Sequence, residues 1–253
     1  MLITLNAKER IWAVPAILGQ AEVLRELHAR LQERLVPGDC LVYLGNYMGF
    51  GPLIAETVDE LLRFRAACAG VEIAHLRGAQ EEMWVKLLEI QWAMRPSETF
   101  KWMMEHGVGA TLRAYGGDPS EASAKFRSGV VVTARWTTVL RENFQSYSGH
   151  YEFLHGLASA VPTSNGKLLF VNAGIDPNKP LEKQNDAFWW NSKGFETLDA
   201  PFERFAFVIR GYDAARKGGR SGPPAICIDT ATGPTGPLSA TCFDPDGAII
   251  ERI

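Results

Sequence analysis

Hydrophobic residues in the first eighty positions form short runs separated by segments with helical spacing. Apolar runs at Ile11–Val14, Cys40–Leu44 and Val71–Leu76 have the length of buried strands. Between them, Ala21–Leu35 and the segment that Pro52 opens carry apolar side chains every three or four positions, which predicts amphipathic helices. This alternation predicts a βαβαβ unit with a parallel sheet, whose ligands bind at the carboxyl ends of the strands.

The middle of the chain, from about residue 81 to 160, has helical spacing and holds many of the large side chains. We interpret it as a helical cap beside the sheet, with these side chains mainly in its core: Trp84, Trp92, Phe100, Trp102, Met103, Met104 and Trp136.

From residue 167 onward the pattern returns to strands. The expected strands are Lys167–Val171, Phe205–Ile209, Ala225–Asp229, Leu238–Phe243 and Ala248–Ile253. Because they follow one another, we expect a second, mainly antiparallel sheet. No linker or repeat divides the chain, so the sequence predicts a single domain over residues 1–253 with the cap inserted at about 81–160.

Composition excludes several classes of function. The chain has 253 residues, is 46% hydrophobic and carries a net charge of −3, which gives no general reason to expect nucleic-acid binding. No apolar run reaches the ~18 residues of a membrane span.

The apolar segment Ile11–Leu18 is short and contains Pro15, so we do not read it as a signal peptide. The four cysteines form no C-x-x-C pair, which favours buried thiols and a cytoplasmic location.

Five expected strands end in a glycine-containing loop, where glycine lets the backbone approach a ligand or adopt a positive φ. These loops begin after Val14, Leu44, Leu76, Val171 and Ile209, with the sequences PAILG, GNYMGFGP, RGAQE, NAGIDP and RGYD.

In order and spacing, these loops resemble those of the calcineurin-like metallophosphoesterases. The bacterial phosphoprotein phosphatases and diadenosine tetraphosphatases of that superfamily carry G-D-x-H-G, L-G-D-x-x-D-R-G-P, R-G-N-H-E, F-V-H-A-G-x-x-P and G-H-T after successive strands. The segments Trp102–Gly116 and His150–Leu154 are also similar to that family. The resemblance spans about residues 11–245. It implies an α/β fold of two stacked mixed β-sheets flanked by helices, with the site where the loops converge.

The first two loops depart from the family pattern at every functional position. Ala16 and Leu18 stand where the family has a metal-binding Asp and His. In the second loop, Asn46 replaces the bridging Asp and Gly49 replaces the second Asp. Phe50 stands where the family has the Arg that binds phosphate.

The later loops depart in the same way. Ala79 and Gln80 replace the metal-binding Asn and the catalytic His of the third loop. Asn172 and Tyr212 replace the two late metal-binding His residues. The resemblance therefore implies a fold that has lost the ligands for its two metals, so we expect no metal and no other cofactor.

Losing the metals would remove the activation of the nucleophile. Two divalent ions lower the pKa of the attacking water from ~15.7 to ~7, which corresponds to about 12 kcal/mol. The amides of Asn46, Gln80 and Asn172 remain as weak possible ligands, and three carboxylates lie near the loops: Glu81, Asp176 and Asp213. None of the five histidines falls in a loop: His28, His75, His106, His150 and His155.

The sequence thus predicts a catalytically inactive pseudophosphatase that binds a protein partner. Two alternatives stay open: a sensor that binds a nucleotide or another phosphorylated ligand, and an active phosphoesterase with atypical ligands. Met48 and Phe50 either fill the emptied pocket or present an apolar contact at its mouth, and the basic segment Arg210–Arg220 is either a solvated loop or a contact for an anion or partner. The candidate partner-binding residues are Met48, Phe50, Arg210, Lys217 and Arg220.

Overall fold

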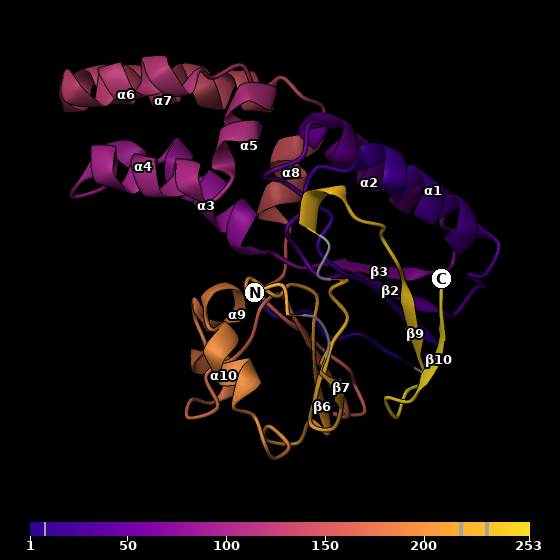
Figure 1. Ribbon diagram of the computed structural model, residues 1–253. Coiled ribbons are helices and arrows are strands. Elements are labelled where there is room, and N and C mark those ends of the chain that lie inside the picture. The colour runs from indigo at the N-terminus through magenta and orange to yellow at the C-terminus, as the bar shows by residue number, and fades with distance from the viewer. Residues whose placement is uncertain (8, 218–219, 231–232) are drawn as a thin grey trace.

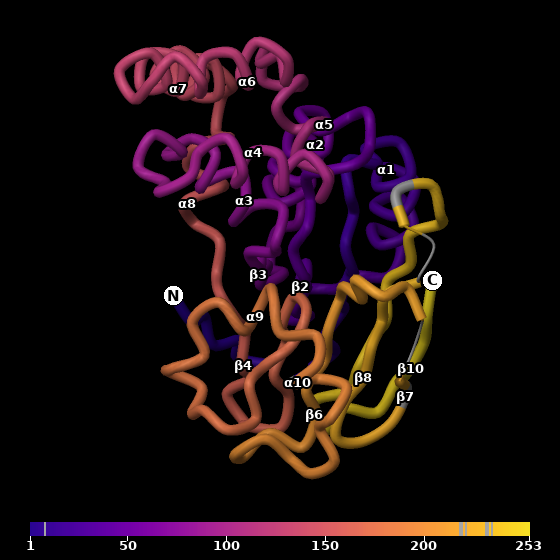
Figure 2. The backbone as a smooth tube through the Cα atoms, turned by 60° about the vertical axis from the view of Figure 1, so that its left-hand side comes forward, coloured from indigo at the N-terminus to yellow at the C-terminus, as the bar shows by residue number. Residues whose placement is uncertain are grey.

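Two five-stranded sheets form the centre of the molecule (Figures 1 and 2). The computed structural model describes residues 1–7, 9–217, 220–230 and 233–253. The first sheet has the order β10-β9-β1-β2-β3, with β1, β2 and β3 parallel and β9 antiparallel to β1. Its strands are β1 (Ile11–Val14), β2 (Cys40–Tyr43), β3 (Glu72–His75), β9 (Thr241–Phe243) and β10 (Ile249–Arg252).

The second sheet has the order β4-β5-β6-β8-β7. Its strands are β4 (Val161–Pro162), β5 (Leu168–Val171), β6 (Phe207–Arg210), β7 (Ser221–Gly222) and β8 (Ala225–Cys227). The prediction of a mainly antiparallel second sheet is wrong, because β5, β6 and β8 are parallel and only the edge strands run the other way. The two last strands, β9 and β10, extend the first sheet instead, with Ile11 opposite Phe243.

Alternate side chains of the central strands enter different layers, which confirms the predicted α/β fold. Ile11 and Ala13 of β1 pack between the two sheets, whereas Trp12 and Val14 pack on the helical side. Because both faces are covered, the strands read as continuous apolar runs. The first sheet is covered by α1 (Ala21–Gln32) and α2 (Ile54–Ala67), and the second by η2 (Leu181–Lys183), α9 (Ala187–Trp190) and α10 (Ser192–Glu196).

The cap consists of the helices between β3 and β4, which project beside the first sheet in Figure 1. They are α3 (Ala79–Leu88), η1 (Ile90–Trp92), α4 (Pro96–Glu105), α5 (Val108–Ala114), α6 (Pro119–Arg127), α7 (Val130–Gln145) and α8 (His150–His155). Trp84, Phe100 and Met103 form part of its core as expected. Trp92 and Trp102 do not: 80% and 42% of their side chains are exposed.

All four cysteines are free thiols, and three of them are buried. In the described part of the chain, no helix is long and apolar enough to cross a bilayer.

Candidate functional site

The five loops singled out in the sequence meet at one edge of the two sheets. The loop after β1 contacts the loop after β6, because the Ala16 N–H donates to the Gly211 carbonyl (2.9 Å). The Leu18 N–H donates to the Asn46 carbonyl (2.8 Å), which joins the first loop to the second. The Tyr212 N–H donates to the Asn172 carbonyl (3.0 Å), so the two loops of the second sheet are joined as well. Parallel strands bring these loops together, since their carboxyl ends lie on the same side.

Glu81, on the first turn of α3, holds the second and third loops together. One carboxylate oxygen accepts the N–H groups of Tyr47 (2.8 Å) and Met48 (3.1 Å), and the other accepts those of Asn46 (2.8 Å) and Gly78 (2.9 Å). The side chain is fully buried. Burial raises the pKa of the Glu81 carboxyl above its ordinary value, and the four N–H donors oppose that rise.

The three amide side chains at replaced positions bind backbone groups of neighbouring loops. Asn46 Oδ1 accepts the Gln80 N–H (3.0 Å), and Asn172 Nδ2 donates to the Leu44 carbonyl (2.6 Å). Gln80 Nε2 donates to the carbonyl of His106 at the end of α4 (2.8 Å). Asn46 Nδ2 and Gln80 Oε1 are buried and have no partner among the described residues. These amides therefore act mainly as links between loops.

Alanine, leucine and glycine occupy four of the other positions that the resemblance matches to the family's site residues, and the half-buried Tyr212 occupies another. Ala16, Leu18 and Ala79 are buried and carry no donor atom. A Cβ at Gly49 would lie 2.1 Å from Gln80 Oε1, so the Gln80 amide takes the space of a side chain at position 49.

Three residues of this site adopt left-handed backbone conformations, with φ of 55° at Leu18, 53° at Asn46 and 61° at Phe50. Such conformations are costly for branched and bulky side chains, and they persist where the surrounding structure fixes them. The strand-end loops are therefore held in a defined shape by contacts within the protein.

The carboxylates that the sequence left open as metal ligands have other partners. Glu81 is bound by four N–H groups, as above. Asp176 pairs with Lys179 (3.1 Å), and Asp213 is buried, where it accepts the Lys217 N–H (2.8 Å) and pairs with Arg210 (3.3 Å). Across the described residues, no three His, Cys, Asp or Glu side chains gather in a way that could hold a metal ion. The residues present do not fit a dinuclear metal centre.

Two residues expected at a partner-binding rim are buried instead, which corrects that part of the prediction. Met48, in the second loop, is fully buried in the core. Arg210 is 1% exposed: its guanidinium lies 4.3 Å from the ring centre of Phe195 and pairs with Glu196 (2.6 Å) and Asp213. Neither side chain offers a surface to a partner in this structure.

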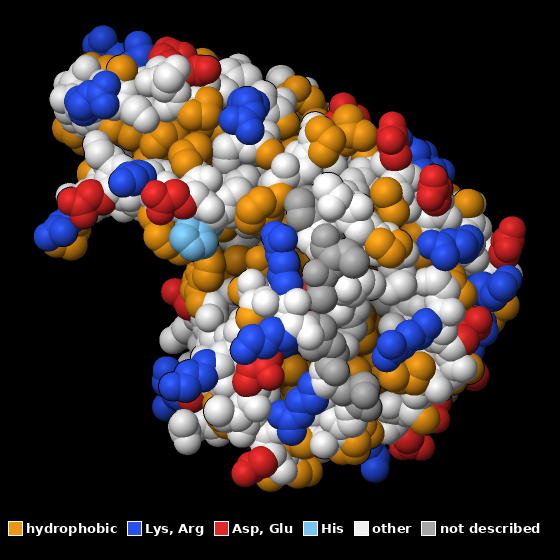
Figure 3. Space-filling model, viewed as in Figure 1, with side chains coloured by type: hydrophobic (Ala, Val, Ile, Leu, Met, Phe, Trp, Pro, Cys, Tyr) orange, Lys and Arg blue, Asp and Glu red, His pale blue; other side chains and the backbone are white. Residues whose placement is uncertain are grey.

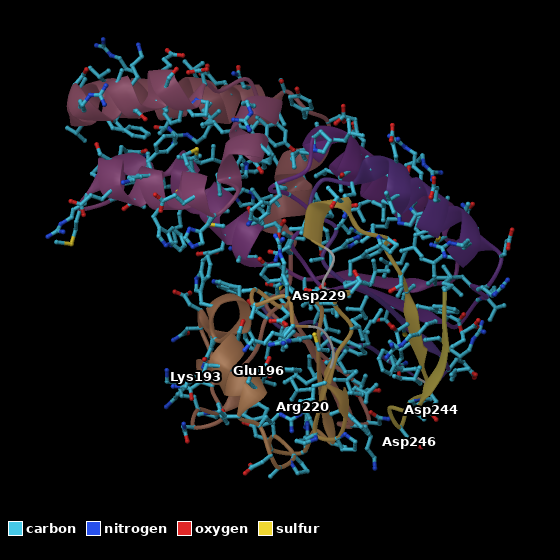
Figure 4. All side chains as sticks on the ribbon, in the orientation of Figure 1. Lys193, Glu196, Arg220, Asp229, Asp244 and Asp246 are labelled. Atoms are coloured by element: carbon cyan, nitrogen blue, oxygen red, sulfur yellow. The ribbon has the colours of Figure 1, made fainter. Side chains whose placement is uncertain are left out.

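The remaining rim residues lie nearer the surface. Phe50 is 37% exposed, its ring lies against Gly107, and its N–H donates to the Gly107 carbonyl (3.2 Å). Lys217 is exposed, whereas Arg220 Nη1 donates to the carbonyl of Glu196 (3.2 Å). Figure 4 labels Arg220 and Glu196, the last residue of α10. Positions 218–219 of the expected basic loop lie outside the described residues.

The histidines lie outside the five loops. Burial lowers the pKa of His28 to about 4 and that of His75 to about 3, so both are neutral at pH 7. His150 is buried against Tyr115. His106 and His155 are exposed.

Sequence reasoning gave no role to Thr111, whose hydroxyl accepts the Gly49 N–H (3.1 Å). It also did not identify Glu81 as the residue that joins the loops. The sequence alone does not distinguish Glu81 from its neighbour Glu82, which instead pairs with Arg77 and Lys86.

Comparisons with known proteins agree with this architecture. Neither a family model nor a curated protein matches the sequence. Among solved structures, a candidate diadenosine tetraphosphatase aligns over all of this chain and 96% of its own, with 18% identity and a TM-score of 0.61. A cold-active protein-tyrosine phosphatase from a psychrophilic Shewanella species aligns over 97% of this chain and 77% of its own (10% identity, TM-score 0.56).

A protein serine/threonine phosphatase from Saccharomyces cerevisiae covers 95% of this chain and 73% of its own, with 12% identity and a TM-score of 0.52. At these identities the likeness concerns the fold alone. The chain shares the two-sheet α/β fold of these phosphatase structures.

Proposed function

We propose that this chain is a catalytically inactive protein with the metallophosphoesterase fold and that it acts by binding a protein partner. One observation carries the proposal. The strand-end loops are intact and joined to one another, yet amide and apolar side chains stand where that fold's phosphatases hold metal ligands.

The chemistry of these side chains supports inactivity. Alanine and leucine donate nothing to a cation, and the amide oxygens of Asn46 and Asn172 are already hydrogen-bonded to backbone N–H groups. Without a metal, the pKa of the attacking water stays at its value in bulk water, and no described residue at the site has the chemistry to replace about 12 kcal/mol of activation.

The replacements also favour a fold that needs no ions. A carboxylate cluster without its metals would place like charges together in a low-dielectric site, which costs several kcal/mol or forces protonation. Here a single buried carboxylate, Glu81, remains among the first three loops, and it is bound by four N–H donors.

A binding role is supported by the shape of the rim. Its loops are hydrogen-bonded to one another and to Glu81 at the ends of two rigid sheets, so a partner would meet a preformed surface. Phe50 is held partly exposed in a left-handed conformation on the second loop, where an aromatic ring suits an interface.

The sensor alternative is less well supported. Phe50 stands at the position of the phosphate-binding Arg, and the nearby Arg210 is buried and paired with Glu196 and Asp213. A guanidinium already neutralised by two carboxylates has little affinity left for a phosphate.

Hydrolysis of a phosphomonoester, p-nitrophenyl phosphate, tests the proposal. The purified chain is assayed with manganese, nickel, cobalt, zinc and magnesium in turn, and we expect background rates with each. Metal-dependent turnover that stays with the chain through a second, different purification would overturn the proposal.

A further inference from the structure

Three exposed tryptophans gather around one cleft between the cap and α9. The cleft has a volume of about 460 Å³, and its walls come from α3, η1 and α4 on one side and α9 on the other. Figure 3 shows a hollow on this side of the molecule with hydrophobic side chains around it. Trp92 is 80% exposed, and Trp102 and Trp190 are each 42% exposed. We call this feature the tryptophan cleft.

Two exposed carboxylates stand beside these indoles. Glu89 precedes η1. The backbone N–H of Trp92 donates to the backbone carbonyl of Glu89 (3.0 Å), so the two residues lie at the ends of one turn. Asp186 precedes α9 in the same way, and the backbone N–H of Trp190 donates to the backbone carbonyl of Asp186 (3.0 Å). Both side chains are exposed and line the cleft, and among the described residues neither carboxylate has a hydrogen-bonded or ionic partner.

The other charges that line the cleft neutralise one another. Glu82 lies 3.6 Å from Lys86 and also pairs with Arg77 (3.1 Å). The cleft therefore keeps an unbalanced negative charge at Glu89 and Asp186.

The tryptophan cleft is continuous with the rim of the replaced metal site. Trp102 contacts Trp190 edge to face, with ring centres 5.7 Å apart, and stacks on His106 at 4.2 Å. The next residue, Gly107, lies against the ring of Phe50. A partner docked on Phe50 would therefore have an aromatic path into the cleft.

We propose that the tryptophan cleft binds an arginine side chain of a protein partner. A guanidinium is planar and weakly hydrated, so it stacks on indole faces, and its fixed N–H donors match a carboxylate. Glu89 and Asp186 supply the complementary charge beside the rings. An apolar side chain would leave both carboxylates unused, and an anion would be repelled by them.

This inference rests on the proposed function in one respect: it takes the side chain that occupies the cleft to belong to a protein partner. The two can fail separately. Metal-dependent turnover would overturn inactivity without affecting the cleft, and failure of the cleft to bind arginine would leave inactivity untouched.

The test uses capped tripeptides, acetyl-Gly-Arg-Gly-amide and its citrulline counterpart, which has nearly the same shape but no charge. Binding to the full chain is followed by NMR on the indole N–H signals, with Trp92, Trp102 and Trp190 assigned from single Trp→Phe variants. We expect the arginine peptide to shift these three signals saturably with a Kd of about 1–10 mM, and the citrulline peptide to bind about tenfold more weakly.

Matched variants locate the charge. Glu89→Gln combined with Asp186→Asn should weaken arginine-peptide binding about tenfold, because both unpaired carboxylates are then neutral. Glu33→Gln, which removes an exposed carboxylate on the C-terminal side of α1, should leave binding unchanged. Equal binding of the citrulline peptide, equal binding of a lysine peptide, or shifts confined to other tryptophans would each overturn the proposal.

Discussion

Replacing Glu81 with glutamine removes the charge that joins the loops after β2 and β3 while keeping the size of the side chain. Each carboxylate oxygen accepts two backbone N–H groups at 2.8–3.1 Å. A glutamine keeps one oxygen, and its NH₂ group must face two N–H donors. Those two donors then lose their acceptor in a fully buried site.

An unsatisfied buried donor costs about 1–3 kcal/mol, so two of them should lower the free energy of unfolding by about 2–6 kcal/mol. Burial also disfavours the charged carboxylate of Glu81, as its raised pKa indicates, so the native ion already carries a cost that glutamine avoids. We therefore expect a loss of stability in the lower half of that range.

Urea unfolding followed by circular dichroism measures this loss. The matched control is Glu89→Gln, at the exposed C-terminal end of the same helix, which should change stability by no more than about 0.5 kcal/mol. If Glu81→Gln were as stable as that control, Glu81 would not be the residue that holds these loops.

Three further outcomes follow from the structure. A chelator such as EDTA should leave the melting temperature unchanged, because under the proposed function no metal contributes to the native state; a fall of several degrees would reveal a structural ion. Phe50→Ala should cost less than about 1 kcal/mol of stability, because the ring is 37% exposed; a loss of about 3 kcal/mol or more would show that Phe50 fills a cavity. His75→Phe should flatten the pH dependence of stability. Burial lowers the folded-state pKa of His75 from 6.5 to about 3, so the unfolded chain binds a proton first as the pH falls below about 6.5. Wild type should therefore lose about 2 kcal/mol more than His75→Phe between pH 7 and pH 5, as measured by urea unfolding at both pH values, and equal losses would show that His75 is protonated in the native state.

The strands near the site could be predicted because a strand that is buried on both faces appears in the sequence as an uninterrupted apolar run. Trp12 and Val42 belong to uninterrupted apolar runs, and the structure places their strands side by side. The pairing of Thr241–Phe243 with β1 left no such trace, because the same apolar run suits either sheet. Sequence reasoning therefore assigned that strand to the wrong sheet.

Burial of charged and apolar side chains near the site was harder to predict. Arg210 stands in a basic, glycine-rich stretch typical of a surface loop, but Phe195, Glu196 and Cys227 from other elements surround its guanidinium. Trp102 has the helical spacing of a core residue and instead lines an open cleft. Such outcomes depend on contacts between elements that lie far apart in the sequence.

The metal content of the purified chain tests the central claim most directly. The protein is incubated with excess manganese, dialysed exhaustively and analysed by inductively coupled plasma mass spectrometry. Because Ala16, Leu18 and Ala79 offer no donor atoms and the nearby carboxylates have other partners, we expect far less than one ion per chain. About two ions per chain, the content of a dinuclear centre, would contradict the account.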